Sequence, residues 1–422
     1  MNFAFHALSL IVAVVLLAFT ARRALFLLAA IFQSPIPNLQ SHRPTRPPAH
    51  LPSILVLIPA RNESRSLPSL FNSLGSLDYP RDRLTVVVVD DGSTDDTAQV
   101  ANEWARGKDW AHLLSLPANV GKPAALNEAL NRFPQGDLIA VYDSDSLPAP
   151  DSLARLARAF DDLIVGAANG FLLPLNSLAS PAAYYSTVEL FVHQRITMAA
   201  KDRLRLAPAI LGSNCVYRRS ALVAVGAFRR GLLLEDSDLT LSLERAGWQA
   251  RFVADAIAQT SVPQSLAGYW KQHIRWARGF QQVVALQGWE SIRDPRAAPG
   301  LRLELLAFAL GYFDRLALLA AAALTALDLL RPGLAGFPLW LWLVYFGLPL
   351  AQIVAAIRLA PETQPAQMYL YLIVVPFFFA FDVAMAVWAT TLDALKRPAQ
   401  WTVTERPTVE RDDTESSGVI YE

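Results

Sequence analysis

Apolar residues gather at the two ends of this 422-residue chain, whereas its middle alternates short apolar runs with amphipathic stretches. Residues 3–20 are almost uninterrupted hydrocarbon, and about 20 such residues suffice to cross a bilayer. Arg22 and Arg23 follow this run instead of preceding it, and a second apolar stretch continues without a cleavage site. The pattern therefore favours a retained transmembrane anchor over residues 1–33 rather than a cleaved signal peptide.

A proline-rich segment separates this anchor from the middle of the chain. Residues 34–52 contain six prolines, which predicts an extended linker with no packed core. Arg43 and Arg46 lie in this linker, shortly after Arg22 and Arg23. Because basic residues flank membrane spans on the cytoplasmic side, these arginines predict that the domain that follows is cytoplasmic.

The other end of the chain contains three further apolar blocks, residues 303–330, 337–357 and 368–392. The last two have ordinary spanning lengths. Asp314 and Arg315 interrupt the first block, so its opening part is expected to lie in the membrane interface as an amphipathic helix. Residues 300–393 are thus expected to form interfacial and transmembrane helices. Few polar side chains are available in them to face inward, chiefly Asp314, Arg315, Gln352 and Asp382.

The side of the membrane on which the chain ends stays open. An anchor plus three later spans would leave the last residues outside, yet Lys396 and Arg397 favour the cytoplasmic side. Residues 394–422 are polar and charged, which predicts a cytoplasmic tail without a core of its own.

From residue 53 the pattern becomes that of an α/β domain, which we expect to extend over residues 53–290. Continuous apolar runs, one of them with four consecutive valines, are typical of strands that are covered on both faces of a parallel sheet. Amphipathic stretches alternate with these runs, so the pattern predicts a doubly wound α/β sheet. Ser93 or Thr94 is expected to cap a helix that begins near Asp95. The expected strands are residues 53–58, 84–89 and 137–142, with helices over residues 67–74 and after Lys122.

Composition excludes several classes of function. Lys and Arg number 37 against 37 Asp and Glu, so the chain has no basic excess with which to bind a nucleic acid. Cys215 is the single cysteine, which excludes an intramolecular disulfide and a cysteine-based zinc site. Only 18% of residues are charged, as expected for a globular domain held between membrane segments.

Carboxylates follow three successive strands of the predicted sheet. Glu63 comes after the first, Asp90 and Asp91 after the second, and Asp143 and Asp145 after the third. In open α/β sheets, ligands bind at the carboxyl ends of the strands. Five carboxylates at one edge would repel one another, and a divalent metal with a diphosphate relieves that repulsion. The chain has no glycine-rich Walker or dinucleotide fingerprint, which disfavours ATPase and NAD-dependent functions.

A second acidic group, Glu235 and Asp236, opens a helix that continues through Leu243. Acidic residues in a first turn also interact favourably with the helix dipole, so this pair by itself leaves a structural role open. An isolated Asp-Asp-Gly-Ser turn is likewise often only a helix cap. The chemical interpretation therefore depends on the whole set of motifs.

Gln272, Arg275 and Trp276 lie in a helix expected to begin near Ser265, with the spacing i, i+3 and i+4 that gives them one shared face. This face suits a sugar and a phosphate better than a core, because Trp stacks on sugar rings and Arg neutralises an oxyanion. His273 points elsewhere and is expected to be structural.

The ordered set Asp-Asp-Gly, Gly-Lys, Asp-x-Asp, Glu-Asp and Gln-x-x-Arg-Trp resembles the membrane-bound family 2 glycosyltransferases with a GT-A fold. The resemblance covers about residues 53–285 and the flanking membrane segments. Within the family the chain is similar to processive β-glycan synthases, such as those of cellulose, hyaluronan, chitin oligosaccharides and poly-N-acetylglucosamine. The implied fold is a GT-A (Rossmann-like) α/β domain flanked by N- and C-terminal transmembrane helices.

The resemblance implies a role for each motif position on the donor side. Asp90 and Asp91 would hold the uracil and ribose, and Asp145 with Asp143 would ligate Mg²⁺ or Mn²⁺ on the diphosphate. The implied nucleotide-sugar-binding residues are Ala60, Glu63, Asp90, Asp91, Lys122, Asp143, Gln272, Arg275 and Trp276.

On the acceptor side, Asp236 matches the general base that deprotonates the acceptor hydroxyl, and Glu235 accompanies it as a catalytic residue. The family usually has Thr-Glu-Asp here, whereas this chain has Leu234 before the acidic pair, a departure that concerns the acceptor. The implied acceptor residues are Gly212, Ser213, Asn214 and Trp276.

A single base acting opposite the departing nucleoside diphosphate implies one displacement, with inversion at the anomeric carbon. The favoured expectation is a polysaccharide synthase that adds GlcNAc or Glc from a UDP-sugar to a growing glycan. Two alternatives stay open, a single transfer to a membrane lipid and a catalytically silent scaffold or sensor.

Low Lys with abundant Ala and Arg suggests a GC-rich bacterial source. The expected location is therefore the bacterial inner (plasma) membrane, as a multi-pass protein with a cytoplasmic catalytic domain. Accessory export subunits are a further class of partner.

Overall fold

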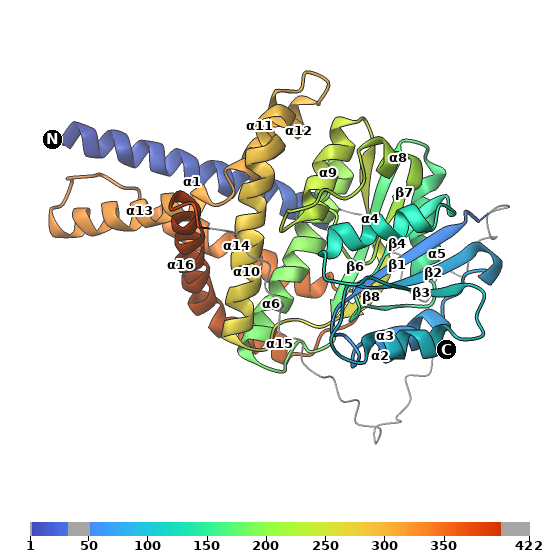
Figure 1. The fold of residues 1–422 in the computed structure, drawn as a ribbon. Coiled ribbons are helices and arrows are strands. Elements are labelled where there is room, and N and C mark those ends of the chain that lie inside the picture. The colour runs from blue at the N-terminus through green and yellow to red at the C-terminus, as the bar shows by residue number, and fades with distance from the viewer. Residues whose placement is uncertain (1, 33–50, 398–422) are drawn as a thin grey trace.

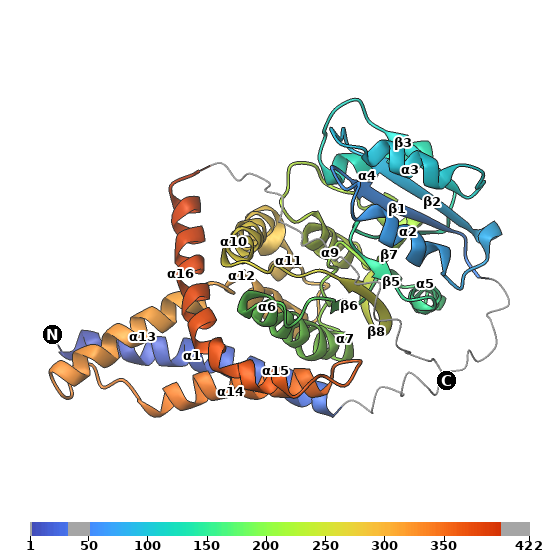
Figure 2. The same cartoon turned by 90° about the horizontal axis from the view of Figure 1, so that it is seen from below.

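A computed structural model describes residues 2–32 and 51–397 (Figure 1). An eight-stranded sheet with helices on both faces forms the middle of the chain, and long helices from both ends of the chain lie beside it (Figures 1 and 2). The expected linker over residues 34–52, with Arg43 and Arg46, lies almost wholly outside the described residues, as does the expected tail over residues 394–422.

The strands are β1 (Ile54–Ala60), β2 (Leu84–Asp90), β3 (Ala111–Ser115), β4 (Leu138–Val141), β5 (Leu147–Pro148), β6 (Val165–Pro174), β7 (Cys215–Arg218) and β8 (Gln249–Thr260). They lie in the order β3-β2-β1-β4-β7-β6-β8-β5. β3, β2, β1 and β4 are parallel neighbours, as the doubly wound pattern predicts. The second half is mixed, because β7 runs antiparallel to both its neighbours and β5 runs antiparallel to β8.

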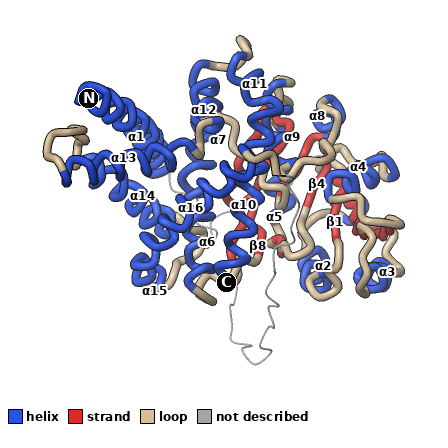
Figure 3. The backbone as a smooth tube through the Cα atoms, turned by 60° about the vertical axis from the view of Figure 1, so that its left-hand side comes forward, coloured by secondary structure: helices blue, strands red, loops and turns tan. Residues whose placement is uncertain are grey.

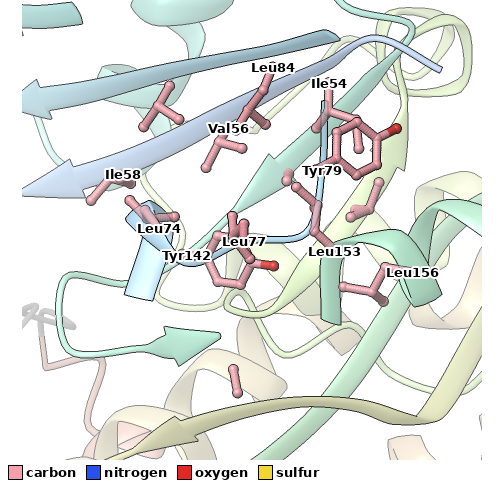
Figure 4. Close-up of a cluster of buried hydrophobic side chains, with 14 of the residues drawn as sticks. Ile54, Val56, Ile58, Leu74, Leu77, Tyr79, Leu84, Tyr142, Leu153 and Leu156 are labelled. Atoms are coloured by element: carbon pink, nitrogen blue, oxygen red, sulfur yellow. The ribbon is translucent and has the colours of Figure 1, made fainter. Parts of the chain in front are cut away.

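The first strands are continuously apolar because both faces of the sheet are covered. In β2, Val86 and Val88 belong to one hydrophobic core, and Val87 and Val89 belong to the core on the opposite face. Figure 4 shows the first of these cores, where Val56 and neighbouring side chains of β1 meet the adjoining helices. The covering helices are α2 (Leu67–Gly75), α3 (Thr97–Ala105) and α5 (Ser152–Arg158) on one face, and α4 (Lys122–Arg132), α8 (Arg219–Ala224) and α9 (Glu235–Arg245) on the other.

Helix α3 begins close to its expected start near Asp95, but neither Ser93 nor Thr94 caps it. The helix begins at Thr97, whose backbone N–H donates to Asp95 Oδ1 at 3.1 Å. Ser93 Oγ instead accepts a hydrogen bond from the backbone N–H of Asn62, 3.0 Å away. The Asp-Asp-Gly-Ser segment is therefore held by the neighbouring strand-end loop rather than by the helix.

The rest of the domain connects the sheet to the long helices. A third hydrophobic core joins Phe26 near the N-terminus, Phe171 of β6 and Phe378 near the C-terminus. The remaining helices of this part are α6 (Pro181–Phe191), α7 (Ala199–Leu204), α10 (Leu266–Val283) and α11 (Trp289–Arg293), with a π-helical segment, Val192–Met198, between α6 and α7. Ser265 caps α10 through its side chain, which confirms the expected start of that helix.

Three helices in the described part of the chain are long and apolar enough to cross a membrane, and a pair bent by 62° is a further candidate. The single helix α1 contains both the apolar N-terminal run and the stretch after Arg23. In Figures 1 and 2, α16 runs across the direction of α1 and α13 rather than along it. These elements are α1 (Asn2–Ile31), the bent pair α12 (Pro299–Ala309) and α13 (Phe313–Leu330), α14 (Trp340–Arg358), the short α15 (Gln367–Leu370) and α16 (Val375–Ala394).

Candidate active site

A cavity of about 1070 Å³ opens at the carboxyl ends of β1, β2 and β4 and continues to the long helices. Because these strands are parallel, the acidic residues that follow them lie at one edge, as the sequence predicts. Glu63, Asp91, Asp143 and Asp145 line the cavity together with Ala60, Lys122, Ser213, Glu235, Asp236, Gln272, Arg275 and Trp276. Three predicted site residues are not part of its lining: Asp90, Gly212 and Asn214.

Asp90 and Asp91 have different roles, because successive residues at the end of a strand point to opposite sides. Asp90 is buried, and its Oδ1 accepts a hydrogen bond from the backbone N–H of Ser93 at 3.0 Å, which holds the turn. Asp91 faces the cavity, where its carboxylate accepts from the backbone N–H groups of Val120 and Gly121 at 2.7 and 2.9 Å. Asp91 thereby fixes the loop that leads into Lys122.

Lys122 contacts both acidic groups, the strand-end carboxylates and the pair that opens α9, which lie far apart in the sequence. Its Nζ lies 2.8 Å from Asp143 Oδ1 and 3.6 Å from Glu235 Oε1, and it donates to the Gly212 carbonyl at 3.0 Å. Burial by itself would lower the pKa of Lys122, but the carboxylates of Asp143 and Glu235 outweigh it and raise that pKa. Lys122 is therefore a permanent positive charge between the strand-end carboxylates and the start of α9.

Asp236 lies in the first turn of α9, where its Oδ1 accepts the backbone N–H of Ser237 at 2.6 Å. Burial and the adjacent Glu235 carboxylate raise the pKa of Asp236 to about 7, although Lys122 acts in the opposite direction. A carboxylate with a pKa near neutrality is suited to general-base catalysis, because it is ionised at working pH and still holds a proton well. The chain therefore positions one basic carboxylate beside the strand-end group.

Gly212 shapes the space next to this carboxylate. Its φ of +73° lies in the left-handed region that glycine adopts readily, and a Cβ there would come 2.8 Å from Asp236 Oδ2. Gly212 thus affects the site through its backbone, since its carbonyl also receives Lys122.

Ser213 and Asn214 divide between the site and the interior. Ser213 borders the cavity, and its Oγ accepts the backbone N–H of Asp143 at 2.9 Å, which fixes the start of the Asp-x-Asp loop. The Asn214 amide is fully buried and donates to the carbonyls of Phe171 and Ala256 at 3.1 and 2.9 Å. Asn214 therefore holds β-sheet backbone together and does not border the cavity as the resemblance implied.

The motif on α10 forms one wall of the cavity, as its spacing predicts. Gln272, Arg275 and Trp276 all line the cavity. His273 also borders it, but the ring is buried, with Nε2 3.1 Å from Glu189 Oε2 and Nδ1 2.9 Å from the Tyr269 carbonyl. These contacts agree with the structural role expected for this histidine.

The donor set at Asp143 and Asp145 fits a hard divalent cation that also binds a substrate. Among the residues that the structure describes, no three His, Cys, Asp or Glu side chains come together as a metal site. Mg²⁺ is typically held by one or two carboxylates plus phosphate oxygens, and Mn²⁺ shares this preference for oxygen ligands. Two cavity-facing carboxylates agree with an ion that arrives with a diphosphate.

The sequence did not reveal how far the candidate membrane helices contribute to this cavity. Asp314, Arg315, Gln352 and Asp382, the inward-facing candidates of the apolar blocks, all line it. Ionisable residues within apolar segments are costly unless they face a partner or a cavity, so such residues are the feature of the sequence that indicates a cavity wall. Arg22 and Arg23, between the two apolar stretches of α1, carry the same signal, whereas no sequence pattern marks Glu189 of α6, which also lines the cavity.

Comparisons with known proteins agree with this arrangement. A family model described as "Glycosyltransferase like family 2" matches residues 52–279, more than half of the chain. The probable glycosyltransferase YdaM of Bacillus subtilis is 32% identical over 238 residues, 56% of this chain and 56% of that protein. An N-acetylglucosaminyltransferase of Mesorhizobium japonicum is 37% identical over 237 residues, 54% of this chain and 55% of that protein. The chain thus matches little more than half the length of these relatives.

Among solved structures, the mannosyltransferase PcManGT from Pyrobaculum calidifontis, in complex with GDP-Man and Mn²⁺, has a TM-score of 0.63. Its sequence is 23% identical, and the match covers 93% of this chain and 100% of that one. At this identity the likeness concerns the fold, which the two chains share.

Proposed function

The chain belongs to family 2 of the glycosyltransferases, and on that premise we propose that it transfers N-acetylglucosamine from UDP-N-acetylglucosamine, with inversion, to a growing glycan at a membrane. One observation carries this proposal. The cavity is continuous from the strand-end carboxylates, past Asp236 and Trp276, to side chains of α1, α13, α14 and α16. A donor site that opens among apolar helices suits an acceptor that is held at the membrane or passes along it.

The choice of sugar rests on the relatives. Several of them are named N-acetylglucosaminyltransferase, including one from Sinorhizobium fredii that is 31% identical over 309 residues, 71% of this chain. UDP-glucose is the second donor to test, because Asp91 and the loop that it fixes would contact the nucleotide rather than the hexose and so would not discriminate between the two sugars.

The chemistry that we propose requires one base and compensation of the leaving-group charge. Asp236 takes the proton from the acceptor hydroxyl, the hydroxyl oxygen bonds to the anomeric carbon from the opposite face, and the bond to the diphosphate breaks. Arg275 and Lys122 balance the negative charge that develops on the departing UDP. No second carboxylate acts as a nucleophile, so the anomeric configuration inverts.

We assign Asp143 and Asp145 as the residues that would hold Mg²⁺ or Mn²⁺. When bound, such an ion neutralises diphosphate charge and favours departure of UDP. Lys122 would keep Asp143 oriented toward this position, since its ammonium group lies 2.8 Å from one of the Asp143 oxygens.

We further assign the catalytic domain to the cytoplasmic face of a bacterial inner membrane, where it meets its UDP-sugar donor. Three helices apolar enough to cross a membrane support the membrane assignment, and the basic residues after the first apolar run support the orientation. We also propose accessory export subunits as a class of partner.

The test is to supply the detergent-purified protein with labelled UDP-N-acetylglucosamine or UDP-glucose, Mn²⁺ or Mg²⁺, and membrane lipid extract, and to measure the size of the product. A ladder or polymer supports glycan synthesis, whereas a single lipid-soluble species overturns it in favour of transfer to a lipid. The control is Asp238→Asn, on the same helix as Asp236 but with its carboxylate on Gln287. It should retain transfer, and Asp236→Asn should lose it.

A further inference from the structure

Asp382 is a buried carboxylate near the middle of the apolar helix α16. A charged group in such surroundings is costly unless it is partnered, and Asp382 has a partner on each oxygen. Its Oδ2 accepts the Tyr185 hydroxyl of α6 at 2.8 Å, and its Oδ1 accepts the Tyr269 hydroxyl of α10 at 2.5 Å. Asp382 therefore connects α16 to the helix that carries the Gln-x-x-Arg-Trp motif.

Helices α10 and α16 lie side by side (Figure 3). Besides the bond to Asp382, the ring of Trp270 packs against Phe381, and Arg278 Nε donates to Asp393 Oδ1 at 2.8 Å. The two polar contacts, at Tyr269 and at Arg278, are nine residues apart on α10. The position of α10 against the rest of the molecule is thus set in large part by α16.

A row of rings leads from Tyr269 to the site. Tyr269 stacks on His273 with centroids 3.8 Å apart, and His273 meets Trp276 edge to face at 4.8 Å. Residues i, i+4 and i+7 of a helix lie along one side, so these contacts are continuous. Glu189 of α6 holds the middle of the row, because its Oε2 lies 3.0 Å from the Tyr269 hydroxyl and 3.1 Å from His273 Nε2.

Tyr269 itself does not reach the cavity. Its side chain is fully buried and is not part of the lining, whereas Trp276 is. Any effect of the Tyr269 hydroxyl on the reaction therefore passes through its neighbours. A substitution of Asp382 would test this path less clearly, because Asp382 itself borders the cavity.

We propose that Tyr269 is a positioning residue, held by Asp382 of the apolar helix α16, that sets the place of Trp276 at the acceptor side of the cavity through His273. This inference rests on the proposed glycosyl transfer. A small displacement of a positioning side chain costs transfer rate, and shifts of about 1 Å are known to cost up to about a hundredfold. On the nucleotide side, Asp91 and Lys122 lie on other elements, and Arg275 of α10 is not part of the ring row, so the affinity for UDP should be unaffected.

The central variant is Tyr269→Phe, which removes the hydroxyl and keeps the ring stack. We expect its kcat/KM for the acceptor to fall about tenfold, while its affinity for UDP stays within about twofold of the wild type. The matched control is Asp393→Asn, which weakens the other polar contact between α10 and α16 without touching the rings, and which should leave both quantities within about twofold.

A double-variant cycle tests the path itself. In a Trp276→Ala background, Tyr269→Phe should cause no further loss, because the group on which it acts is absent. Fully additive losses would overturn the inference, as would an unchanged acceptor kcat/KM in Tyr269→Phe, or an equal loss of UDP affinity, which would indicate a general structural role.

Failure of the inference is distinguishable from failure of the proposed function. If the wild-type protein transfers no sugar from either UDP-sugar, the proposed function fails and the positioning role fails with it. If the wild type transfers sugar and Tyr269→Phe does so equally well, only the positioning role fails.

Discussion

Replacing Glu235 by Gln should shift the pH dependence of transfer toward lower pH. Asp236 must be ionised to accept a proton, and its pKa of about 7 means that it becomes protonated as the pH falls below neutrality. For the wild type, kcat/KM should therefore fall about tenfold for each pH unit below 7. The Glu235 carboxylate is the largest cause of this raised pKa after burial, so removing its charge should lower the pKa.

The size of the shift follows from the electrostatics of the pair. The pKa of Asp236 rises from 3.8 to about 7, and each pH unit corresponds to about 1.36 kcal/mol, so about 4 kcal/mol disfavours the ionised form. A like charge within a few ångströms typically accounts for about one pH unit or more of such a change. Lys122 remains in place in the variant and continues to favour ionisation. The midpoint of the acid limb should thus move from about 7 to about 6.

The assay is initial-rate release of UDP between pH 5 and 9 at constant ionic strength and constant Mn²⁺, with kcat/KM plotted against pH. The position of the limb is informative even if Glu235→Gln lowers the absolute rate. Asp238→Asn is the control, because the Asp238 carboxylate lies by Gln287 and Arg229, and its limb should stay near 7. An unmoved limb in Glu235→Gln, or one moved to higher pH, would refute the assignment of Asp236 as the base.

Three further variants separate chemistry from architecture. Asp236→Asn should bind UDP normally while transfer falls by about 10²–10⁴-fold, as calorimetry and turnover would report. The pKa of Asp236 is higher in the folded protein than in the unfolded chain, so the protonated carboxyl stabilises the fold at low pH, and this contribution is lost as the pH rises through the folded pKa of about 7. Asp236→Asn should therefore also raise Tm at pH 8 but not at pH 4. Gly212→Ala should cost about 1 kcal/mol of stability and slow transfer, since its Cβ would approach Asp236 Oδ2 to 2.8 Å; unchanged turnover would contradict this. Asn214→Ala should lower the free energy of unfolding, measured by denaturation, by about 1–3 kcal/mol, because the Phe171 and Ala256 carbonyls lose their hydrogen-bond donor. The KM for the acceptor should not change. A raised KM at unchanged stability would instead support the acceptor role of Asn214.

The strands, and the sheet edge that carries the carboxylates, are predicted well because the local pattern of apolar residues indicates which segments are buried. The run Val86 to Val89 is typical of a strand that is buried on both faces. The parallel neighbours β1, β2 and β4 then bring their terminal carboxylates to one edge. The pattern also contains the difference between Asp90 and Asp91, because alternation along β2 assigns them to opposite faces. What local pattern does not contain is which of the two faces opens into a cavity.

Contacts between residues far apart in the chain could not be predicted. Asp382 and Tyr269 are 113 residues apart, and nothing in either neighbourhood marks the other as its partner. Asn214 illustrates the other side of this, since its motif position implied the acceptor pocket, whereas in the structure its amide donates to two carbonyls of the sheet. A motif indicates which loop approaches the site, and tertiary packing decides which side chain of that loop enters it.

The structure also bears on the side of the membrane where the chain ends. Helix α13 runs against α1, since Asp314 at its start pairs with Arg23 at 2.9 Å and Gly336 after its end lies beside His6. Helix α14 returns, because Gln352 Nε2 donates to the Arg23 carbonyl. These three helices form an up-down-up set.

Helix α16 does not continue this alternation. It is held along α10 at both Asp382 and Asp393, and it runs across the direction of α1 (Figures 1 and 2). Because these contacts hold α16 against α10 at two points, we expect α16 to lie at the membrane surface rather than to cross the bilayer. On this expectation three of the described helices cross the membrane, namely α1, α13 and α14, and residue 397 lies on the side of the catalytic domain, which agrees with the basic residues Lys396 and Arg397.

Cysteine labelling tests this topology, because the native Cys215 is fully buried and should not react. Single cysteines at three exposed positions, Ser220 on the catalytic domain, Lys396 after α16 and Pro332 between α13 and α14, are exposed to a membrane-impermeant maleimide in sealed vesicles of either orientation. Ser220→Cys and Lys396→Cys should label in the same vesicles, and Pro332→Cys in the opposite ones. If Lys396→Cys labels together with Pro332→Cys, then α16 crosses the bilayer, and the contacts with α10 do not keep it on the catalytic side.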